Sequence, residues 1–443
     1  MAKDMTKGSI ARTLIAFSLP LIFSGLLQQL YSWADAFIVG NAIGEGALAA
    51  IGASSVISGL FIAIITGFTA GISILSAKLF GSGDKSAQKK LLNDFSLILG
   101  GVFLALSLLG AALTKPMLQL LDTPADIFAD AAVYLRIIFP GVPFLAVYNV
   151  YSAVLRGIGD SRVPFLSVLF SSVLNVVLDA LFVFAFGWGV AGAAAATLLS
   201  QAMMTAFIVF YAIRKYDFLR FKPAFPPMDS ALVREGCRLA LPITIQSAIS
   251  SAGMLILQNF TNSFGTQTVA AITSAYRVDS IILLPIINLG TAISTVTAQN
   301  IGAGKRDRAR RSLTVGCGIV TVVSLVLTAL VVVLGGALVG MFGVTEQVQQ
   351  IGADFFRALG SFYVVFGLST AIRGYLEGIG DVVFSGVNGI AMLLMRIILS
   401  YALRPVYGNM VIAWAEAYAW CIMLIAYAVR VWMKLRSRNP AKQ

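Results

Sequence analysis

The chain has 443 residues, of which 58% are hydrophobic and only 12% are charged. About a quarter of the residues of a soluble domain are charged, and a soluble chain of this length could not bury so much apolar surface. This composition excludes soluble enzymes, disordered chains and secreted disulfide scaffolds, and it predicts an integral membrane protein. The chain contains no histidine, which excludes catalysis, metal ligation and proton relays by that residue.

Twelve long apolar segments follow one another along the chain. Most exceed the roughly 20 residues that a helix needs to cross a bilayer, and none shows the strict alternation of a barrel strand. The sequence therefore predicts an all-α integral membrane protein with twelve transmembrane helices. The expected helices cover residues 13–39, 48–77, 91–113, 128–154, 164–186, 190–213, 236–262, 268–299, 313–341, 347–372, 383–403 and 411–433.

Lysines and arginines gather in every second gap between these segments. The side that holds both termini receives 26 of the 32 basic residues, whereas the opposite side receives only Lys115 and Arg404. By the positive-inside rule, both termini are expected in the cytoplasm and the protein in the cytoplasmic membrane, inner or plasma. The formal net charge of +12 is thus explained by membrane topology, and no nucleic-acid partner is expected.

The sequence repeats itself at a fixed offset of 221 residues. Three pairs of segments match at this offset: 44–51 with 265–272, 77–83 with 298–304, and 155–160 (LRGIGD) with 376–381 (LEGIGD). Because each copy holds six predicted helices, both copies insert the same way up, which predicts two pseudo-symmetric six-helix lobes. The expected domains are an N-terminal lobe over 1–213, a cytoplasmic linker over 214–235, and a C-terminal lobe with a cytoplasmic tail over 236–443.

Two aspartates lie inside predicted helices of the first lobe, where a charged group costs about 2.5–3.5 kcal/mol at the membrane centre. At about 1.5 Å per residue, Asp35 lies ~6 Å and Asp179 ~11 Å below the outer helix ends. Asn175 lies one turn before Asp179 on the same face, and Thr197 lies at a similar depth. These oxygen-bearing side chains are expected to converge on a small hard cation, such as Na⁺, or a shared proton. Alternatively, they are unrelated polar residues bonded to nearby backbone.

The second lobe differs at the equivalent positions. At the offset of 221, Asn175 corresponds to Arg396 and Asp179 to Ser400, while Glu416 has no acidic counterpart. Arg396 and Glu416 lie at similar depths, so we interpret them as a neutralising charge pair, with a role in substrate binding as the alternative.

Several uncharged polar side chains lie on the opening helix of each lobe. They are expected either to line a substrate cavity or to form bonds between helices, and the sequence leaves both interpretations open. These residues are Gln28, Gln29, Tyr31, Gln246, Gln258 and Asn259.

With these features the sequence resembles the multidrug and toxic compound extrusion (MATE) transporters over essentially its whole length. The resemblance is carried by the twelve segments, the two halves, LPLI at 19–22, DAFIVG at 35–40 and both GIGD loops. Its most specific part is NVVLD at 175–179, followed by GVAGAAAAT at 189–197.

The resemblance implies roles for individual residues. In this family the first-lobe cation site uses residues that correspond to Asp35, Asn175, Asp179 and Thr197, and the first helix bends at a proline that corresponds to Pro20. Some members also carry an acidic residue eight positions after the proline of the seventh helix. Ser250 stands there in this chain, so a second-lobe ion site of that type is not expected.

The predicted function is therefore a secondary antiporter that exports bulky, often cationic organic compounds in exchange for H⁺ or Na⁺, with multidrug efflux and antibiotic resistance as consequences. The glycine-rich stretches at 81–86 and 302–306 do not fit a nucleotide-binding loop, so an ion gradient is expected to supply the energy, without a cofactor.

The alternative is a flippase for a lipid-linked precursor. A membrane enzyme is not expected, because no nucleophile–base set or metal-ligand cluster is visible. Expected partners are small organic substrates and membrane lipids, and the monomer is expected to be functional.

Overall fold

The computed structural model describes residues 4–220 and 228–436, and every secondary-structure element within these ranges is helical. The first half contains α1 (Ile10–Ala42), α2 (Glu45–Ser82), α3 (Lys85–Ala112), α4 (Thr114–Leu120), α5 (Ala125–Ile138), η1 (Phe139–Gly141), α6 (Val142–Gly157), α7 (Arg162–Asp179), η2 (Ala180–Ala185), α8 (Gly189–Lys215) and η3 (Asp217–Leu219). The second half contains α9 (Ser230–Asn262), α10 (Thr266–Ile282), α11 (Leu284–Gly302), α12 (Arg306–Gly340), α13 (Glu346–Gly360), α14 (Tyr363–Gly378), α15 (Val382–Ala402), α16 (Arg404–Tyr407), η4 (Gly408–Met410) and α17 (Val411–Arg436).

Within the described ranges, ten helical stretches are long and apolar enough to cross a membrane. Two bent pairs bring the number to twelve: α10 and α11 meet at 41°, and α13 and α14 at 49°. Each predicted segment coincides with one of these spans. The break before α11 has a local cause, because Pro285 lies in the first turn of α11 and a proline cannot donate to the preceding turn.

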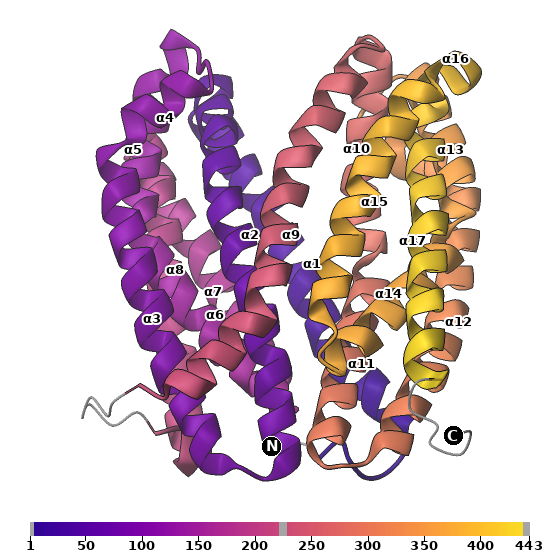
Figure 1. Cartoon of the computed structure of the whole chain (residues 1–443). Helices are drawn as coiled ribbons and strands as arrows, with labels where there is room; N and C mark the ends of the chain where they lie inside the picture. The colour runs from indigo at the N-terminus through magenta and orange to yellow at the C-terminus, as the bar shows by residue number, and fades with distance from the viewer. Residues whose placement is uncertain (1–3, 221–227, 437–443) are drawn as a thin grey trace. The chain divides into compact units, whose positions relative to one another are not determined.

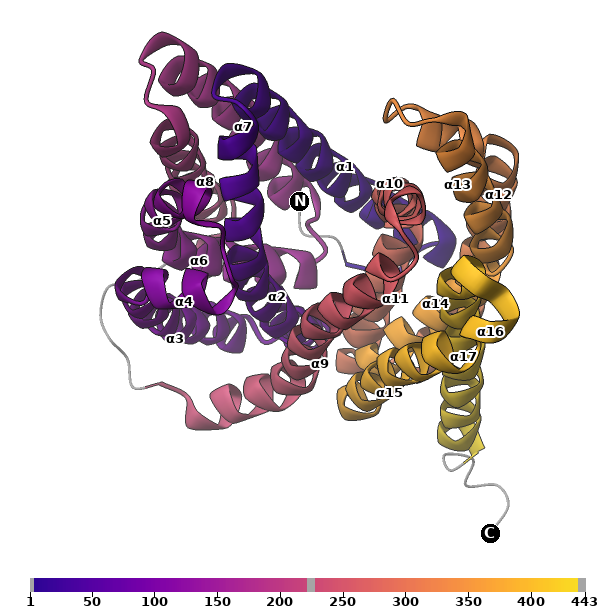
Figure 2. The ribbon, with the colours of Figure 1, turned by 90° about the horizontal axis from the view of Figure 1, so that it is seen from above.

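The chain forms two compact units, each an all-helical bundle. The first consists mainly of Pro20–Thr244, and the second combines Met5–Leu19 with the chain from Ile245 onward. In the first unit α2 packs against α5 and α6, and α7 packs against α8 (Figure 1). In the second unit α11 packs against α14, and α15 against α17, as the view from above shows for the latter pair (Figure 2).

Two long helices, α1 and α9, each contribute to both units. The boundary in α1 falls between Leu19 and Pro20, and the boundary in α9 falls after Thr244, two residues beyond Pro242. Both prolines lie inside their helices. A proline inside a helix removes one backbone hydrogen bond and lowers the cost of bending there. Each helix is therefore easiest to bend close to the residue at which it passes from one unit to the other.

The expected division into lobes around a linker at 214–235 stays a prediction. Part of that linker, 221–227 with Pro223, Pro226 and Pro227, lies outside the described residues. After this gap, Asp229 caps the start of α9, since its carboxylate accepts a hydrogen bond from the Leu232 N–H at 3.2 Å.

Candidate functional site

Two carboxyl groups from different helices meet in the first unit. Asp35 lies on α1 and Asp179 is the last residue of α7, and their side chains lie close to each other. Asp179 is completely buried and Asp35 is half-buried. Asn175, one turn earlier on α7, is also buried, with 2% of its surface exposed. The predicted pair of aspartates is thus brought together, with Asn175 on the adjoining turn.

These buried polar atoms lack hydrogen-bond donors and acceptors from the described part of the chain. Oδ1 of Asp35, both carboxylate oxygens of Asp179 and both amide atoms of Asn175 have no partner in residues 4–220 and 228–436. Two ionised carboxylates cannot stay together in an apolar surrounding unless a proton or a cation lies between them. The oxygen-rich composition fits a proton or a hard cation such as Na⁺. No group of three or more His, Cys, Asp or Glu side chains in the described ranges is arranged to hold a metal ion.

Thr197 joins this group through a residue that the sequence analysis missed. Tyr134 on α5 is buried and lies near Thr197 on α8 and near both Asp35 and Asp179. Tyr31, which was predicted either to line a substrate cavity or to form a bond between helices, also lies near both aspartates. Tyr134 lies within the predicted helix 128–154, but tyrosine is common at membrane interfaces, so its presence there gave no signal.

The helix that carries Asn175 and Asp179 changes its geometry directly after the site. α7 ends at Asp179, and the next six residues form the π-helical turn η2. Such turns are rare, and they are frequently found at functional sites. Phe182 in this turn stacks on Trp188, with 5.0 Å between ring centroids. This aromatic contact joins the wide turn to the start of α8.

The second unit contains a different buried cluster at the equivalent place. Nη2 of Arg396 on α15 lies 2.9 Å from Oε2 of Glu416 on α17. The Tyr276 hydroxyl links the two: it accepts a hydrogen bond from Arg396 at 2.6 Å and donates one to Glu416 at 2.9 Å. The structure therefore brings the predicted pair of charges together and adds a tyrosine bridge.

The same cluster includes an aspartate that the sequence analysis missed. Asp279 on α10 is 5% exposed, lies near both Arg396 and Glu416, and accepts a hydrogen bond from the Tyr363 hydroxyl. Asp279 falls inside the predicted helix 268–299, so the cost of burying a charge in a membrane would have identified it. Two acids here face one guanidinium group, whereas the first unit places two acids together without a cation from the described chain.

Comparison with known proteins gives a family for this fold and charge pattern. The family model described as MatE matches residues 20–181 and 242–402, so that its two matches begin at Pro20 and Pro242.

The chain belongs to the MATE family of multidrug efflux transporters.

It is similar to the "Probable multidrug resistance protein YpnP" of Bacillus subtilis, with 31% identity over 93% of this chain and 91% of that protein. It is also similar to the "Probable multidrug resistance protein NorM" of Thermotoga maritima, with 25% identity over 84% of this chain and 81% of that protein. A solved outward-facing MATE transporter superposes with a TM-score of 0.91, at 22% identity and 98% coverage of both chains. The predicted family and the all-α membrane architecture are confirmed.

The uncharged polar residues predicted for this MATE transporter lie in different surroundings. Gln28, Gln258 and Asn259 are exposed, and Gln29 is half-buried. Gln246 is 8% exposed and accepts a hydrogen bond from Arg373 on α14 at 3.1 Å, which corresponds to the alternative of a bond between helices. Gln258 lines a small pocket of about 30 Å³ together with Arg396, enough space for about one water molecule.

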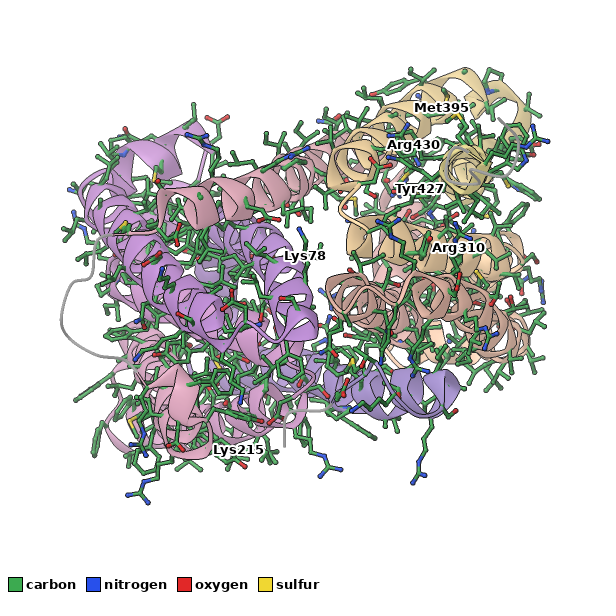
Figure 3. All side chains as sticks on the ribbon, turned by 60° about the horizontal axis from the view of Figure 1, so that its bottom comes forward. Lys78, Lys215, Arg310, Met395, Tyr427 and Arg430 are labelled. Atoms are coloured by element: carbon green, nitrogen blue, oxygen red, sulfur yellow. The ribbon has the colours of Figure 1, made fainter. Side chains whose placement is uncertain are left out.

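Each of the two GIGD loops of this MATE transporter contacts basic residues near the end of a helix in its own unit. Asp160 of the first loop lies 2.8 Å from Lys215 at the end of α8 and also accepts a hydrogen bond from Tyr216. Asp381 of the second loop lies 2.8 Å from Arg430 and 3.4 Å from Lys434, both on α17. Figure 3 labels Lys215 and Arg430 at these two helix ends. The repeated motif thus makes the same kind of contact twice.

The charges around these loops shift the titration of both aspartates. Burial raises the pKa of Asp160, but hydrogen bonds from Lys215 and Tyr216 and the charge of Lys215 outweigh burial, so its pKa lies below the ordinary value. In the same way, Arg430 and Lys434 outweigh the effect of burial and lower the pKa of Asp381. Both carboxylates therefore stay ionised at neutral pH and hold their cations.

Proposed function

We propose that this MATE transporter is a secondary antiporter that exports bulky, often cationic organic compounds in exchange for H⁺ or Na⁺. The observation that carries the proposal is the contact between Asp35 and Asp179, whose buried oxygens lack donors from the described chain. Such a pair is stable only while a positive charge lies between its members. The protein would act as a monomer in the cytoplasmic membrane, with both termini in the cytoplasm.

The two aspartates lie on helices that can move relative to each other. Asp179 is held by the packing of α7 against α8, whereas Asp35 lies fifteen residues beyond Pro20 on α1. A bound proton or Na⁺ supplies the positive charge that lets the two carboxyl groups stay in contact. Repulsion between the carboxylates would otherwise push the Asp35 part of α1 away from α7, and Pro20 lowers the cost of that bend.

Exchange requires that the coupling ion and the substrate favour different conformations. In our proposal, one position of α1 keeps Asp35 close to Asp179, and the other position leaves room for substrate beside α1. Tyr134, Thr197 and Asn175 would orient the two carboxyl groups and supply further oxygen ligands. Tyr31, one turn before Asp35, would move with it.

The second-unit cluster is proposed to be structural. Arg396 already has a partner in Glu416, and Tyr276 bridges the pair. A flippase for an anionic lipid-linked precursor would need cationic side chains available to its ligand. Because Arg396 is engaged and Arg373 pairs with Glu377 at 2.6 Å, no observation favours that alternative.

Transport into vesicles tests the proposal. Purified protein is reconstituted into liposomes, a pH gradient or a Na⁺ gradient is imposed, and uptake of a fluorescent organic cation is followed. We expect at least one gradient to drive accumulation against the concentration gradient, and an ionophore that dissipates this gradient to abolish it. Equal uptake with and without both gradients would contradict an antiport mechanism.

A further inference from the structure

The segment that precedes α1 is held inside the second unit by hydrogen bonds to its backbone. Met5 is completely buried. Its backbone N–H donates to the side-chain oxygen of Gln299 at 3.0 Å, and its carbonyl oxygen accepts from Asn300 at 3.4 Å. Gln299 and Asn300 lie on α11 and have no exposed surface. Two buried amides therefore bind the backbone of a residue almost 300 positions earlier in the chain.

Two cations continue this contact along the next residues. Nζ of Lys305 donates to the carbonyl oxygen of Thr6 at 2.9 Å, and Nη2 of Arg308 donates to the carbonyl oxygen of Lys7 at 2.8 Å. Arg308 also donates to the Met5 carbonyl at 3.3 Å. Hydrogen bonds from charged donors are stronger than those between neutral groups. Three consecutive carbonyl groups, of residues 5–7, are thus bound by the loop and first turn of α12.

The start of α9 is attached to the first unit by analogous contacts. Lys78 lies 2.6 Å from Glu235, and the Asp229 N–H donates to the carboxylate of buried Asp94 at 3.2 Å. Further along α9, Gly71 of α2 lies so close to Ala240 that a Cβ at Gly71 would come within 2.4 Å of the Ala240 backbone. Each unit therefore holds the beginning of a helix whose remainder belongs to the other unit.

These contacts fix the N-terminal end of α1 to the second unit. We propose that Gln299, Asn300, Lys305 and Arg308 are positioning residues that anchor residues 5–7 to the second unit throughout transport. Because the anchored end cannot move, bending at Pro20 displaces the part of α1 that carries Asp35 and leaves the part before Pro20 in place. This inference rests on the proposed antiport function, since it specifies which part of α1 responds to the ion.

A reversible tether tests whether the anchor stays closed. Cys237, Cys317 and Cys421 are first replaced by alanine, and Thr6→Cys and Lys305→Cys are then introduced together. A short, reducible bifunctional thiol reagent links residues 6 and 305, and the two single-cysteine variants treated in the same way serve as controls. Because Lys305→Cys itself removes one of the anchor's charged donors, export is compared in the same double-cysteine protein before and after linking, and we expect linking to leave gradient-driven export unchanged or to raise it. Loss of export on linking, reversed by reductant, would show that residues 5–7 must separate from α11 and the start of α12 during transport. That result would overturn the proposal.

Weakening the anchor tests its positioning role. Arg308→Gln removes the charged donor to the carbonyl oxygens of Met5 and Lys7, and we expect export to fall at least about ten-fold, since losing even one charge-assisted hydrogen bond has an effect of that size. Arg308→Lys keeps a cation and should retain export, and Arg306→Gln, at an exposed position in the same turn, is the matched control. The tether between residues 6 and 305 should restore export to Arg308→Gln. If Arg308→Gln exports normally, or if the tether fails to rescue a loss, the positioning role is wrong.

A measurement without transport separates this inference from the antiport proposal. Hydrogen exchange of the Met5 backbone amide should stay slow in wild-type protein with and without added organic cation and Na⁺, after correction for intrinsic rates. Gln299→Leu should accelerate it, because the acceptor of that amide is removed. If wild-type protein shows no export but exchange stays slow, the antiport proposal fails and the anchor stands. If ion or substrate makes the amide exchange fast, the anchor is not permanent and the inference fails.

Discussion

The carboxyl groups of Asp35 and Asp179 face each other from two helices, and three of their four oxygens are buried without a donor from the described chain. Proteins rarely leave buried polar atoms unsatisfied. The second unit shows the contrast, because its buried acids are matched by Arg396, Tyr276 and Tyr363. The unmatched pair is therefore the place in this transporter where a coupling ion would have most effect.

The hydroxyl of Tyr134 is expected to support that pair. Tyr134→Phe removes a buried hydroxyl that lies near Thr197 and the two aspartates. A hydrogen-bonding group of this kind is worth about 0.5–1.5 kcal/mol, so we expect a roughly two- to ten-fold loss of gradient-driven export. Tyr151→Phe, at another buried tyrosine of the first unit, is the control and should export normally. Equal export by both variants, measured in the same liposomes, would remove Tyr134 from the site.

The charge pair of the second unit should behave as a coupled unit. Breaking a buried pair costs about 3–5 kcal/mol because one charge is left uncompensated. Arg396→Gln leaves Glu416 beside Asp279 and should destabilise the protein most. Glu416→Gln leaves Arg396 with Asp279 as a remaining counter-charge and should destabilise it less.

A double-mutant cycle measured by thermal unfolding in detergent checks this order. The double variant Arg396→Gln with Glu416→Gln should be more stable than Arg396→Gln alone, since it removes the uncompensated glutamate. If the losses of the two single variants simply add up, the pair contributes no coupling energy and the structural role is wrong.

The contact of Asp160 should make stability depend on acid pH. Its pKa is lower in the folded protein than in an unfolded chain, where aspartate titrates near 3.9. The stabilisation is therefore present above that pH and disappears as the pH falls through the lower pKa of the folded state.

Thermal unfolding across pH 3–7 measures the effect. Asp160→Asn should cost about 1.5–3 kcal/mol near neutral pH, typical of a hydrogen bond to a charged group, and the difference from wild type should shrink as the pH falls below about 4. Asp126→Asn, at an exposed position, should match wild type throughout. A constant difference between Asp160→Asn and wild type over this range would contradict the assigned role of the charge.

Pro20 should determine how easily α1 bends. Pro20→Ala restores a backbone donor and makes the helix interior more favourable by up to about 3 kcal/mol. We expect unchanged protein levels but a lower maximal rate of export, with little change in the substrate concentration for half-maximal rate. An unchanged maximal rate, compared with the wild type at saturating substrate, would show that bending at Pro20 does not limit transport.

Much of this fold could be predicted from sequence because a membrane imposes strong local rules. Twelve apolar segments and a repeated GIGD motif are visible in the composition and spacing of the chain. Asp35 and Asp179 could be selected by the cost of placing a charge in lipid. The approach of Arg396 to Glu416 followed from the same cost, since each needs a partner.

Other features depend on contacts between distant segments and left no local signal. The burial of Met5 against Gln299 joins the beginning of the chain to its second half, and no periodicity records it. Tyr134 is part of the site only because α7 and α8 place Asp179 and Thr197 close to it, and these residues are distant from it in the sequence. The change of unit within α1 and α9 likewise required the packed structure, although Pro20 had suggested a bend.

The most direct test of ion coupling compares variants of the two facing aspartates. Asp35→Asn and Asp179→Asn keep the shape of each side chain but remove one negative charge, and Asp130→Asn, at an exposed position in the same unit, controls for the substitution itself. Export of an organic cation is measured in liposomes under an imposed pH gradient and under an imposed Na⁺ gradient. We expect both site variants to fold normally and to lose gradient-driven export under both conditions, while Asp130→Asn exports like wild type. Wild-type export by either site variant under both gradients would contradict the claim that these two carboxyl groups couple ion and substrate.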